Sequence, residues 1–391
     1  MSVSVSPRER VASHIARLPK SGIRDFFELV NAMDGVISLG VGEPDFDTPW
    51  TIREAAIYAL DKGHTSYTSN LGLLALRQAI CTYVANEYGL VRDPVKECIV
   101  TVGVSQGLDL ALRALLEPGD EVIYHEPCYV AYGPNIAMTH AVPVPVVTQE
   151  ADRFALDPAA VAAKITPRTR ALLLNFPCNP TGANLTLAQK QALAALAIRH
   201  DLVVITDEIY SELTYGERSP CIATLPGMAE RTLFLHGFSK AFAMTGFRLG
   251  YAVGPPDLID AMMKIHQYTM LCASIIAQEA ALEALRGGYK AMLAMREEYF
   301  QRRNVIVARL NALGLPCVLP EGAFYAFPNI SRTGLPAGEF ALRLLREEKV
   351  AVVPGTAFCP GATQYVRCAY ATGIAEIEEA MARLGRFLGR L

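Results

Sequence analysis

Short apolar runs alternate with longer amphipathic segments along the middle of the chain, between about residues 98 and 254. The runs are rich in valine, isoleucine and leucine, and they lie at residues 98–102, 121–124, 170–175, 202–206, 232–235 and 250–253. Segments between them, such as 108–116 and 187–198, repeat apolar residues at helical spacing. Strands that alternate with helices in this way predict an α/β fold, with a mostly parallel sheet covered by helices on both faces.

The pattern changes after Pro255, where the sequence becomes strongly helical. We expect a nearly continuous helix from about residue 258 to 313, broken at Gly287-Gly288, that links the sheet to a second unit. Beyond it, strands are expected at 317–319, 323–327, 350–353 and 365–368, and helices at 337–347 and 374–388. This predicts a large domain over residues 46–285, and a smaller α/β domain formed by residues 286–391 with an N-terminal arm at 1–45.

The composition narrows the classes of partner. The chain has 391 residues, and this length favours two domains. Hydrophobic residues make up 51% and the net charge is only -3, so we expect neither disorder nor nucleic-acid binding. The longest uncharged stretch, 127–149, is interrupted by prolines, and the N-terminus lacks the apolar core of a signal peptide, so no membrane association or export is expected. The nine cysteines form no C-x-x-C pair, which predicts no zinc or other metal site and a cytoplasmic protein.

One lysine stands in a stretch of small and apolar residues, Ser239-Lys240-Ala241-Phe242, eight residues before Arg248. A buried ammonium is costly unless it is paired or used chemically, and burial lowers the lysine pKa until the free amine can attack a carbonyl. The hydroxyl of Ser239 and the guanidinium of Arg248 suit a phosphate group. The stretch therefore indicates Schiff-base chemistry.

Two further motifs point the same way. Asp207-Glu208-Ile209-Tyr210 closes an apolar run, and a carboxylate at the end of a buried strand needs a cation or a hydrogen-bond donor. Asn179-Pro180-Thr181-Gly182 follows another expected strand. Together with the lysine stretch, and in this order, these motifs resemble the class I and II aminotransferases of the pyridoxal-phosphate fold-type I superfamily. The resemblance extends from Gly42 to Arg367.

The resemblance implies pyridoxal 5'-phosphate as the cofactor. The residues expected to contact it are Tyr67, Val104, Ser105, Tyr129, Asn179, Asp207, Tyr210, Ser239, Lys240 and Arg248. Of the three expected catalytic residues, Lys240 binds the cofactor covalently and moves the α-proton, Asp207 holds the pyridine nitrogen protonated, and Tyr210 donates to the phenolic oxygen.

Each of the other contacts has an implied role. Asn179 joins Tyr210 at the phenolic oxygen, and Tyr129 stacks on the pyridine ring. The phosphate is expected to meet Val104, Ser105, Ser239 and Arg248, at a glycine-containing turn that opens a helix.

The substrate side of the site is also implied by the resemblance. Arg367 matches the clamp for a substrate α-carboxylate, with Gly42 and Asn179 as further substrate contacts. Tyr67 matches a tyrosine that reaches the phosphate of the neighbouring subunit, which implies a homodimer with shared active sites. A cis peptide bond is expected before Pro180.

The expected reaction is ping-pong transfer of an amino group from an L-amino acid to a 2-oxo acid, with 2-oxoglutarate as the expected acceptor. Related aspartate aminotransferases often carry a lysine where Ser105 stands, which puts aspartate in doubt as a donor. The segment at 265–272 instead looks like the branch associated with N-acetyl-diaminopimelate or with aromatic and other neutral amino acids.

Two alternatives remain open. A lyase or synthase that eliminates a β-leaving group could use the same cofactor motifs. A regulator that binds pyridoxal phosphate would need an attached DNA-binding module, and the segment before Gly42 is too short for one.

Overall fold

The computed structural model describes residues 10–18, 30 and 33–391, so much of the expected N-terminal arm lies outside the described residues. Its main feature is a seven-stranded sheet with the strand order β2-β8-β7-β6-β5-β3-β4. The strands are β2 (Cys98–Thr101), β3 (Glu121–Glu126), β4 (Val142–Val147), β5 (Thr169–Leu174), β6 (Val203–Asp207), β7 (Thr232–Gly237) and β8 (Gly250–Val253). β8 runs antiparallel to β2 and β7, and all other neighbours are parallel. The expected mostly parallel sheet is confirmed.

β4 was absent from the sequence prediction because Pro143 and Pro145 interrupt its apolar pattern. The strand lies at the edge of the sheet and pairs only with β3. Proline cannot donate a backbone hydrogen bond, and an edge strand tolerates this because one of its sides needs no partner.

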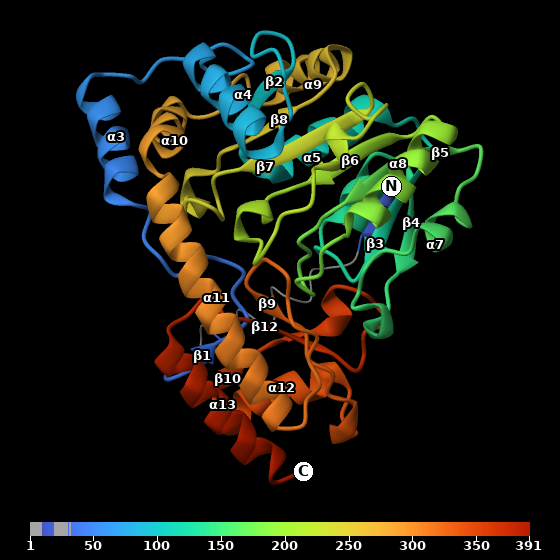
Figure 1. Ribbon diagram of the computed structural model, residues 1–391, viewed down its shortest axis with the longest axis vertical. Coiled ribbons are helices and arrows are strands. Elements are labelled where there is room, and N and C mark those ends of the chain that lie inside the picture. The colour runs from blue at the N-terminus through green and yellow to red at the C-terminus, as the bar shows by residue number, and fades with distance from the viewer. Residues whose placement is uncertain (1–9, 19–29, 31–32) are drawn as a thin grey trace, which may run out of the picture.

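Helices cover both faces of this sheet, as expected (Figure 1). Successive strand residues point to opposite faces. Thus Leu173 packs with α5 (Gly103–Leu115), α6 (Tyr132–Met138) and α9 (Pro256–Thr269), whereas Leu172 packs with α7 (Pro158–Ala162) and α8 (Leu187–Arg199). Because both faces of these strands are buried, their sequences are continuous apolar runs, which is why the runs predicted strands.

A second group of helices lies beside β2 and β8. It contains α3 (Trp50–Asp61), α4 (Leu74–Tyr88) and α10 (Ile275–Gly287), which pack on one another. A further short helix, α1 (Ser13–Ala16), contacts α6.

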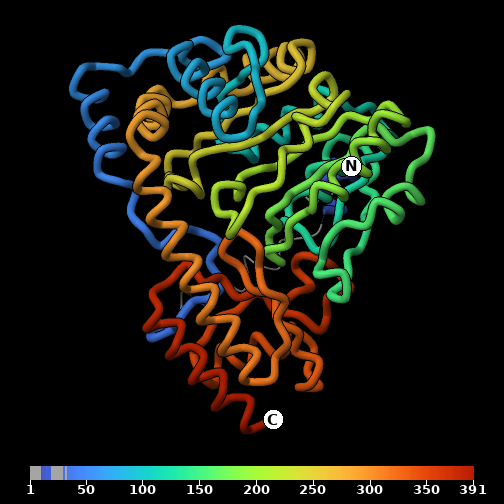
Figure 2. The backbone as a smooth tube through the Cα atoms, viewed as in Figure 1, coloured from blue at the N-terminus to red at the C-terminus, as the bar shows by residue number. Residues whose placement is uncertain are grey.

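The prediction of a nearly continuous helix over 258–313, broken only at Gly287-Gly288, is wrong in one place. Gly287-Gly288 does separate α10 from α11 (Tyr289–Ala312), but a second break lies at residues 270–274. There Leu271 adopts a φ of 68°, and the Ser274 hydroxyl caps α10 by accepting from the Ala277 backbone N–H. α11 alone then runs from the sheet region to the C-terminal part (Figures 1 and 2).

The C-terminal part contains two small sheets and two helices. β9 (Tyr325–Ala326), β11 (Val353–Pro354) and β12 (Val366–Ala369) form an antiparallel sheet, and β1 (Ile37–Ser38) pairs parallel with β10 (Val350–Ala351). The helices are α12 (Ala337–Glu348) and α13 (Ile374–Leu388).

The prediction of one strand in this part is wrong. Residues 317–319 form no strand, and the Cys317 N–H donates to the Asn311 side chain (3.1 Å) instead of to a neighbouring strand. Within the described ranges, no helix is long and apolar enough to cross a membrane.

Candidate active site

A cavity of about 500 Å³ opens where the parallel strands of the large sheet end. β6 ends at Asp207, β7 ends just before Ser239, and β2 leads into α5. In sheets of this kind, ligands bind outside the carboxyl ends of the strands, because the loops there converge. The cavity is lined by all the site residues predicted from the sequence except Tyr67, namely Gly42, Val104, Ser105, Tyr129, Asn179, Asp207, Tyr210, Ser239, Lys240, Arg248 and Arg367.

The Lys240 side chain reaches into this cavity. Its Nζ donates to the Gly42 carbonyl oxygen at 2.6 Å and lies 5.8 Å from the centre of the Phe324 ring. Burial lowers the pKa of Lys240 to about 8, against the opposing effect of the Glu43 carboxylate. With this pKa, roughly a tenth of the amine is unprotonated at pH 7, compared with well under a thousandth for an ordinary lysine, and nucleophilic attack requires this free form.

Asp207 is a buried carboxylate at the end of β6. Tyr132 Oη donates to one carboxylate oxygen (2.7 Å) and the Ile209 N–H to the other (3.1 Å). Burial raises the pKa of Asp207 to about 6, although these donors favour the ionised form. Within the described part of the chain it forms no salt bridge, so it is poised to pair with a buried cationic ligand group.

Arg367, on β12, faces the same cavity from the C-terminal part. Its guanidinium donates to Asn179 Oδ1 (2.9 Å) and to the Gly40 carbonyl (2.6 Å), both neutral oxygens. It also lies 4.4 Å from the centre of the Tyr325 ring. Its Nε is buried and has no hydrogen-bond partner among the described residues. A buried cation with an unused N–H is well suited to an anion such as a carboxylate.

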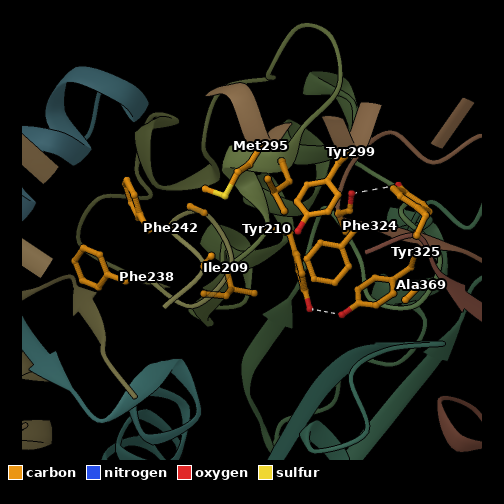
Figure 3. Close-up of a cluster of buried hydrophobic side chains, with 14 of the residues drawn as sticks. Ile209, Tyr210, Phe238, Phe242, Met295, Tyr299, Phe324, Tyr325 and Ala369 are labelled. Carbon is orange, nitrogen blue, oxygen red and sulfur yellow. Dashed lines mark hydrogen bonds between the residues drawn. The ribbon is translucent and has the colours of Figure 1, made fainter. Parts of the chain in front are cut away.

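Tyr210 and Tyr325 connect the two sides of the cavity. Their hydroxyl oxygens lie 2.8 Å apart, and their rings meet edge to face within a buried aromatic cluster that includes Phe324 and Tyr299 (Figure 3). A Cβ on Gly42 would lie 2.8 Å from Tyr325 Oη, so the backbone at Gly42 approaches this hydroxyl as only glycine can.

The far end of the cavity gathers groups that suit a phosphate. α5 begins at Gly103, whose φ is 74°, and Ser105 lies in its first turn. A Cβ on Gly103 would lie 2.9 Å from an Arg248 Nη, so the guanidinium lies close to the start of the helix. Backbone N–H groups at a helix start, two serine hydroxyls and one guanidinium form a suitable anion site.

Tyr67 lies outside the cavity of its own chain. Its side chain is 82% exposed, on the segment between α3 and α4. Tyr129 lies in the cavity wall beside Tyr132. The expected cis peptide bond before Pro180 is confirmed.

Sequence reasoning missed several lining residues. Tyr132 and Tyr325 resemble ordinary core tyrosines, and only their hydroxyl contacts reveal them. Glu43 was not among the predicted site residues; its carboxylate accepts a hydrogen bond from the Thr245 hydroxyl, and both residues line the cavity. The available signal was the spacing of Tyr132 three residues after Tyr129, which lets the Tyr132 backbone N–H donate to the Tyr129 carbonyl (3.1 Å) in the turn before α6.

Comparison with known proteins agrees with this geometry. Residues 34–384 match the family described as "Aminotransferase class I and II", and the chain belongs to this family. The aspartate aminotransferase of Pyrococcus abyssi is 44% identical over 371 residues, covering 94% of this chain and 95% of that protein. Aromatic-amino-acid aminotransferase 2 of Thermococcus litoralis is 43% identical, with the same two shares covered. The solved structure of Thermus thermophilus aspartate aminotransferase with maleate has a TM-score of 0.92 and 39% identity, covering 96% of this chain and 99% of that one.

The protein is therefore an aminotransferase of fold type I that uses pyridoxal phosphate and acts on amino acids and 2-oxo acids. The described residues fit this cofactor: the amine of Lys240, the buried carboxylate of Asp207 and the anion site at the start of α5 line one cavity.

Proposed function

We propose that this cavity is the active site, and that the enzyme transfers the amino group of an L-amino acid with an uncharged side chain to 2-oxoglutarate. The observation that carries the proposal is the convergence of Lys240, Asp207 and Arg367 in one cavity. Asp207 and Arg367 are buried and Lys240 is half-buried, and the described residues neutralise none of the three charges through a salt bridge. Such groups are expected where a ligand completes the charge balance.

The cofactor would be held from several sides. Asp207 would pair with the pyridine nitrogen, Asn179 and Tyr210 would donate to the phenolic oxygen, and Tyr129 would stack on the ring. Val104, Ser105, Ser239 and Arg248 would hold the phosphate. Bound pyridoxal phosphate supplies an aldehyde and a conjugated ring that stabilises negative charge developing at the substrate α-carbon.

Lys240 would be both the covalent attachment point and the residue that moves the α-proton. A pKa of about 8 lets its amine accept and release a proton near neutral pH. The contact of Nζ with the Gly42 carbonyl holds the amine within the cavity, where it would meet the aldehyde of the cofactor. Tyr132, through its bond to Asp207, would stabilise the ionised carboxylate.

Arg367 would bind the α-carboxylate common to all donors and acceptors. Asn179 accepts a hydrogen bond from this guanidinium and so holds its orientation. Gly42 leaves room for the substrate beside Tyr325 Oη. This arrangement would fix the α-carbon near Lys240 whatever side chain the substrate carries.

The donor side chain would be uncharged. The cationic residues that line the described cavity are Lys240, Arg248 and Arg367, and each already has a proposed role. Ser105 adds no further positive charge for a distal carboxylate. The compared relatives include both an aspartate aminotransferase and an aromatic-amino-acid aminotransferase. Sequence similarity alone therefore does not decide between an acidic and an uncharged donor.

The test is a panel of donors with 2-oxoglutarate, for wild type and for Ser105→Lys. Wild type should prefer phenylalanine and other neutral donors over aspartate, and Ser105→Lys should raise aspartate activity relative to phenylalanine. An unchanged ranking in the variant would contradict the specificity role of Ser105. Pyruvate release from cystathionine without amino transfer would instead favour a β-eliminating enzyme.

We further propose a homodimer with shared sites. The exposed apolar side chains of Ile57, Tyr58 and Tyr67 lie in the region of α3 and the segment after it. The Asn70 side chain bonds to the Leu271 carbonyl (2.8 Å), which brings the exposed Met270 and Leu271 to the same region. Exposed apolar side chains gathered in one region in this way favour association with a second copy.

Mixing two damaged proteins tests this sharing. Tyr67→Phe and Lys240→Ala subunits, once exchanged, should form heterodimers in which one site carries both changes and the other is intact. Activity above that of the separately treated parents would support the proposal. A monomer that is fully active at nanomolar concentration would refute it.

Two broader expectations complete the proposal. The division into a large domain (46–285) and a small domain (1–45 with 286–391) is supported by the seven-stranded sheet, which lies wholly within the first range. A cytoplasmic location is supported by the nine cysteines, which are all free thiols.

A further inference from the structure

A pair of side chains, the half-buried Gln106 and the buried His266, lies directly behind the phosphate end of the cavity. Gln106 is in the first turns of α5, next to Ser105, and His266 is on α9, which packs against α5 (Figure 1). His266 is completely buried. Neither residue has a role in the proposed chemistry.

The hydrogen bonds assign the orientation of both side chains. The Val102 backbone N–H donates to Gln106 Oε1 at 2.7 Å, so the other amide atom of Gln106 is the NH₂ group. This NH₂ lies 3.1 Å from His266 Nδ1. Because an amide NH₂ can only donate, Nδ1 must be unprotonated and the histidine proton must reside on Nε2. His266 is therefore a neutral acceptor, in agreement with the burial that lowers its pKa. Its Nε2–H is buried and has no hydrogen-bond partner among the described residues, so the bond at Nδ1 is the one that His266 contributes.

The Gln106 side chain thus reaches back to the residue that precedes α5. This resembles the way in which a glutamine in a capping box satisfies a backbone N–H at a helix start. The same turn is held from its other side, where the Thr101 hydroxyl donates to the Gly103 carbonyl (2.9 Å). Val104 and Ser105, the expected phosphate contacts, lie in the sequence between Gly103 and Gln106, which are each held by one of these two bonds.

We infer that Gln106 and His266 are positioning residues for cofactor binding: His266 holds the Gln106 amide so that Gln106 fixes the turn that presents Val104 and Ser105 to the phosphate. This inference rests on the proposed function. Without the acceptor on His266, the half-buried Gln106 NH₂ would lose its described partner, and rotation of the amide would break its bond to Val102.

The experiment measures cofactor affinity in the holoenzyme and in matched variants. His266→Leu removes the acceptor at similar volume, whereas His266→Asn keeps an acceptor oxygen near the position of Nδ1. Met262→Leu, one turn earlier on α9 and also buried, is the packing control. Each holoenzyme is diluted into cofactor-free buffer, and pyridoxal phosphate is titrated back while absorbance and transaminase activity are followed.

We expect His266→Leu to weaken cofactor affinity about tenfold, the loss typical of one unsatisfied buried donor. At saturating cofactor its kcat should stay within about twofold of wild type. His266→Asn and Met262→Leu should bind the cofactor like wild type. Gln106→Leu should match His266→Leu, and the double variant should be no weaker than either single variant, because one interaction is removed in each case.

Unchanged cofactor affinity in folded His266→Leu and Gln106→Leu would overturn the inference. So would equal weakening by Met262→Leu, which would mean that packing alone is responsible. If His266→Leu does not fold, the comparison of Gln106→Leu with wild type decides. A wild-type protein that binds no pyridoxal phosphate or transfers no amino group would instead defeat the proposed function, so the two failures are distinguishable.

Discussion

Replacing Arg367 by alanine should weaken every amino donor and every acceptor to a similar extent. Arg367 is only 4% exposed, and its described hydrogen-bond partners, Asn179 Oδ1 and the Gly40 carbonyl, are neutral. The substrate carboxylate would therefore be the counter-charge of a buried guanidinium. Because all substrates carry this carboxylate, the loss should not depend on the side chain.

The magnitude follows from the burial. Removing one partner of a desolvated charged pair costs about 2 to 5 kcal/mol. Since the described partners leave the guanidinium charge unneutralised, we expect about 3 kcal/mol or more, which is a loss of roughly 150-fold or more in kcat/KM. Arg367→Lys should lie between alanine and wild type, because an ammonium keeps the charge but loses the planar fork.

The assay measures kcat/KM for phenylalanine, glutamate and aspartate as donors and for 2-oxoglutarate as acceptor. Arg309→Ala is the control, since it removes an exposed arginine that pairs with Glu378 (2.9 Å) away from the cavity. This control should change no kinetic constant by more than about twofold. A loss confined to one donor, or a loss matched by Arg309→Ala, would refute the role of Arg367 as a general carboxylate clamp.

The remaining predictions concern the groups that would meet the cofactor. Lys240→Ala should still bind pyridoxal phosphate through Ser105, Ser239 and Arg248, yet show no turnover in a transaminase assay; normal turnover would contradict its assignment. Asp207→Asn should lose several kcal/mol of transition-state stabilisation, and a rate within about threefold of wild type would argue against pairing with the pyridine nitrogen. In the cofactor-free protein, burial raises the pKa of Asp207 from 3.8 to about 6. As the pH rises through this range, the folded protein must bury an ionised carboxylate, so the free energy of unfolding falls by about 3 kcal/mol in all. Urea unfolding of wild type and Asp207→Asn at pH 4 and pH 7 should therefore show the variant gaining stability relative to wild type at the higher pH, and parallel profiles would show that the carboxylate is not destabilised by burial.

Much of the sheet could be predicted because its strands are buried on both faces. Leu172 and Leu173 point to opposite faces and both meet helices, so the strand appears in the sequence as an unbroken apolar run. β4 lacks that signal, because its edge position admits two prolines. The break at 270–274 was missed for a related reason: Leu271 adopts a left-handed conformation that nothing in its residue type suggests.

The sequence by itself indicated the candidate groups for the chemistry. These groups lie in short local motifs: Lys240 with Arg248, Asp207 with Tyr210, and Asn179 with Pro180. A local motif can be recognised in the sequence without knowing how the rest of the chain folds. The tertiary structure alone decided what these groups experience. The raised pKa of Asp207 and the lowered pKa of Lys240 come mainly from burial by distant segments.

Only the fold also revealed the residues that contact these candidate groups. Tyr132 meets Asp207, Tyr325 meets Tyr210, and His266 meets Gln106, each across more than 70 positions of the chain. A hydroxyl or an imidazole in an apolar stretch looks like part of the core until its partner is known. A hydrogen bond depends on the distance and direction between two groups in space. The number of residues between them in the sequence gives neither of these quantities, so such contacts could not be predicted from the sequence.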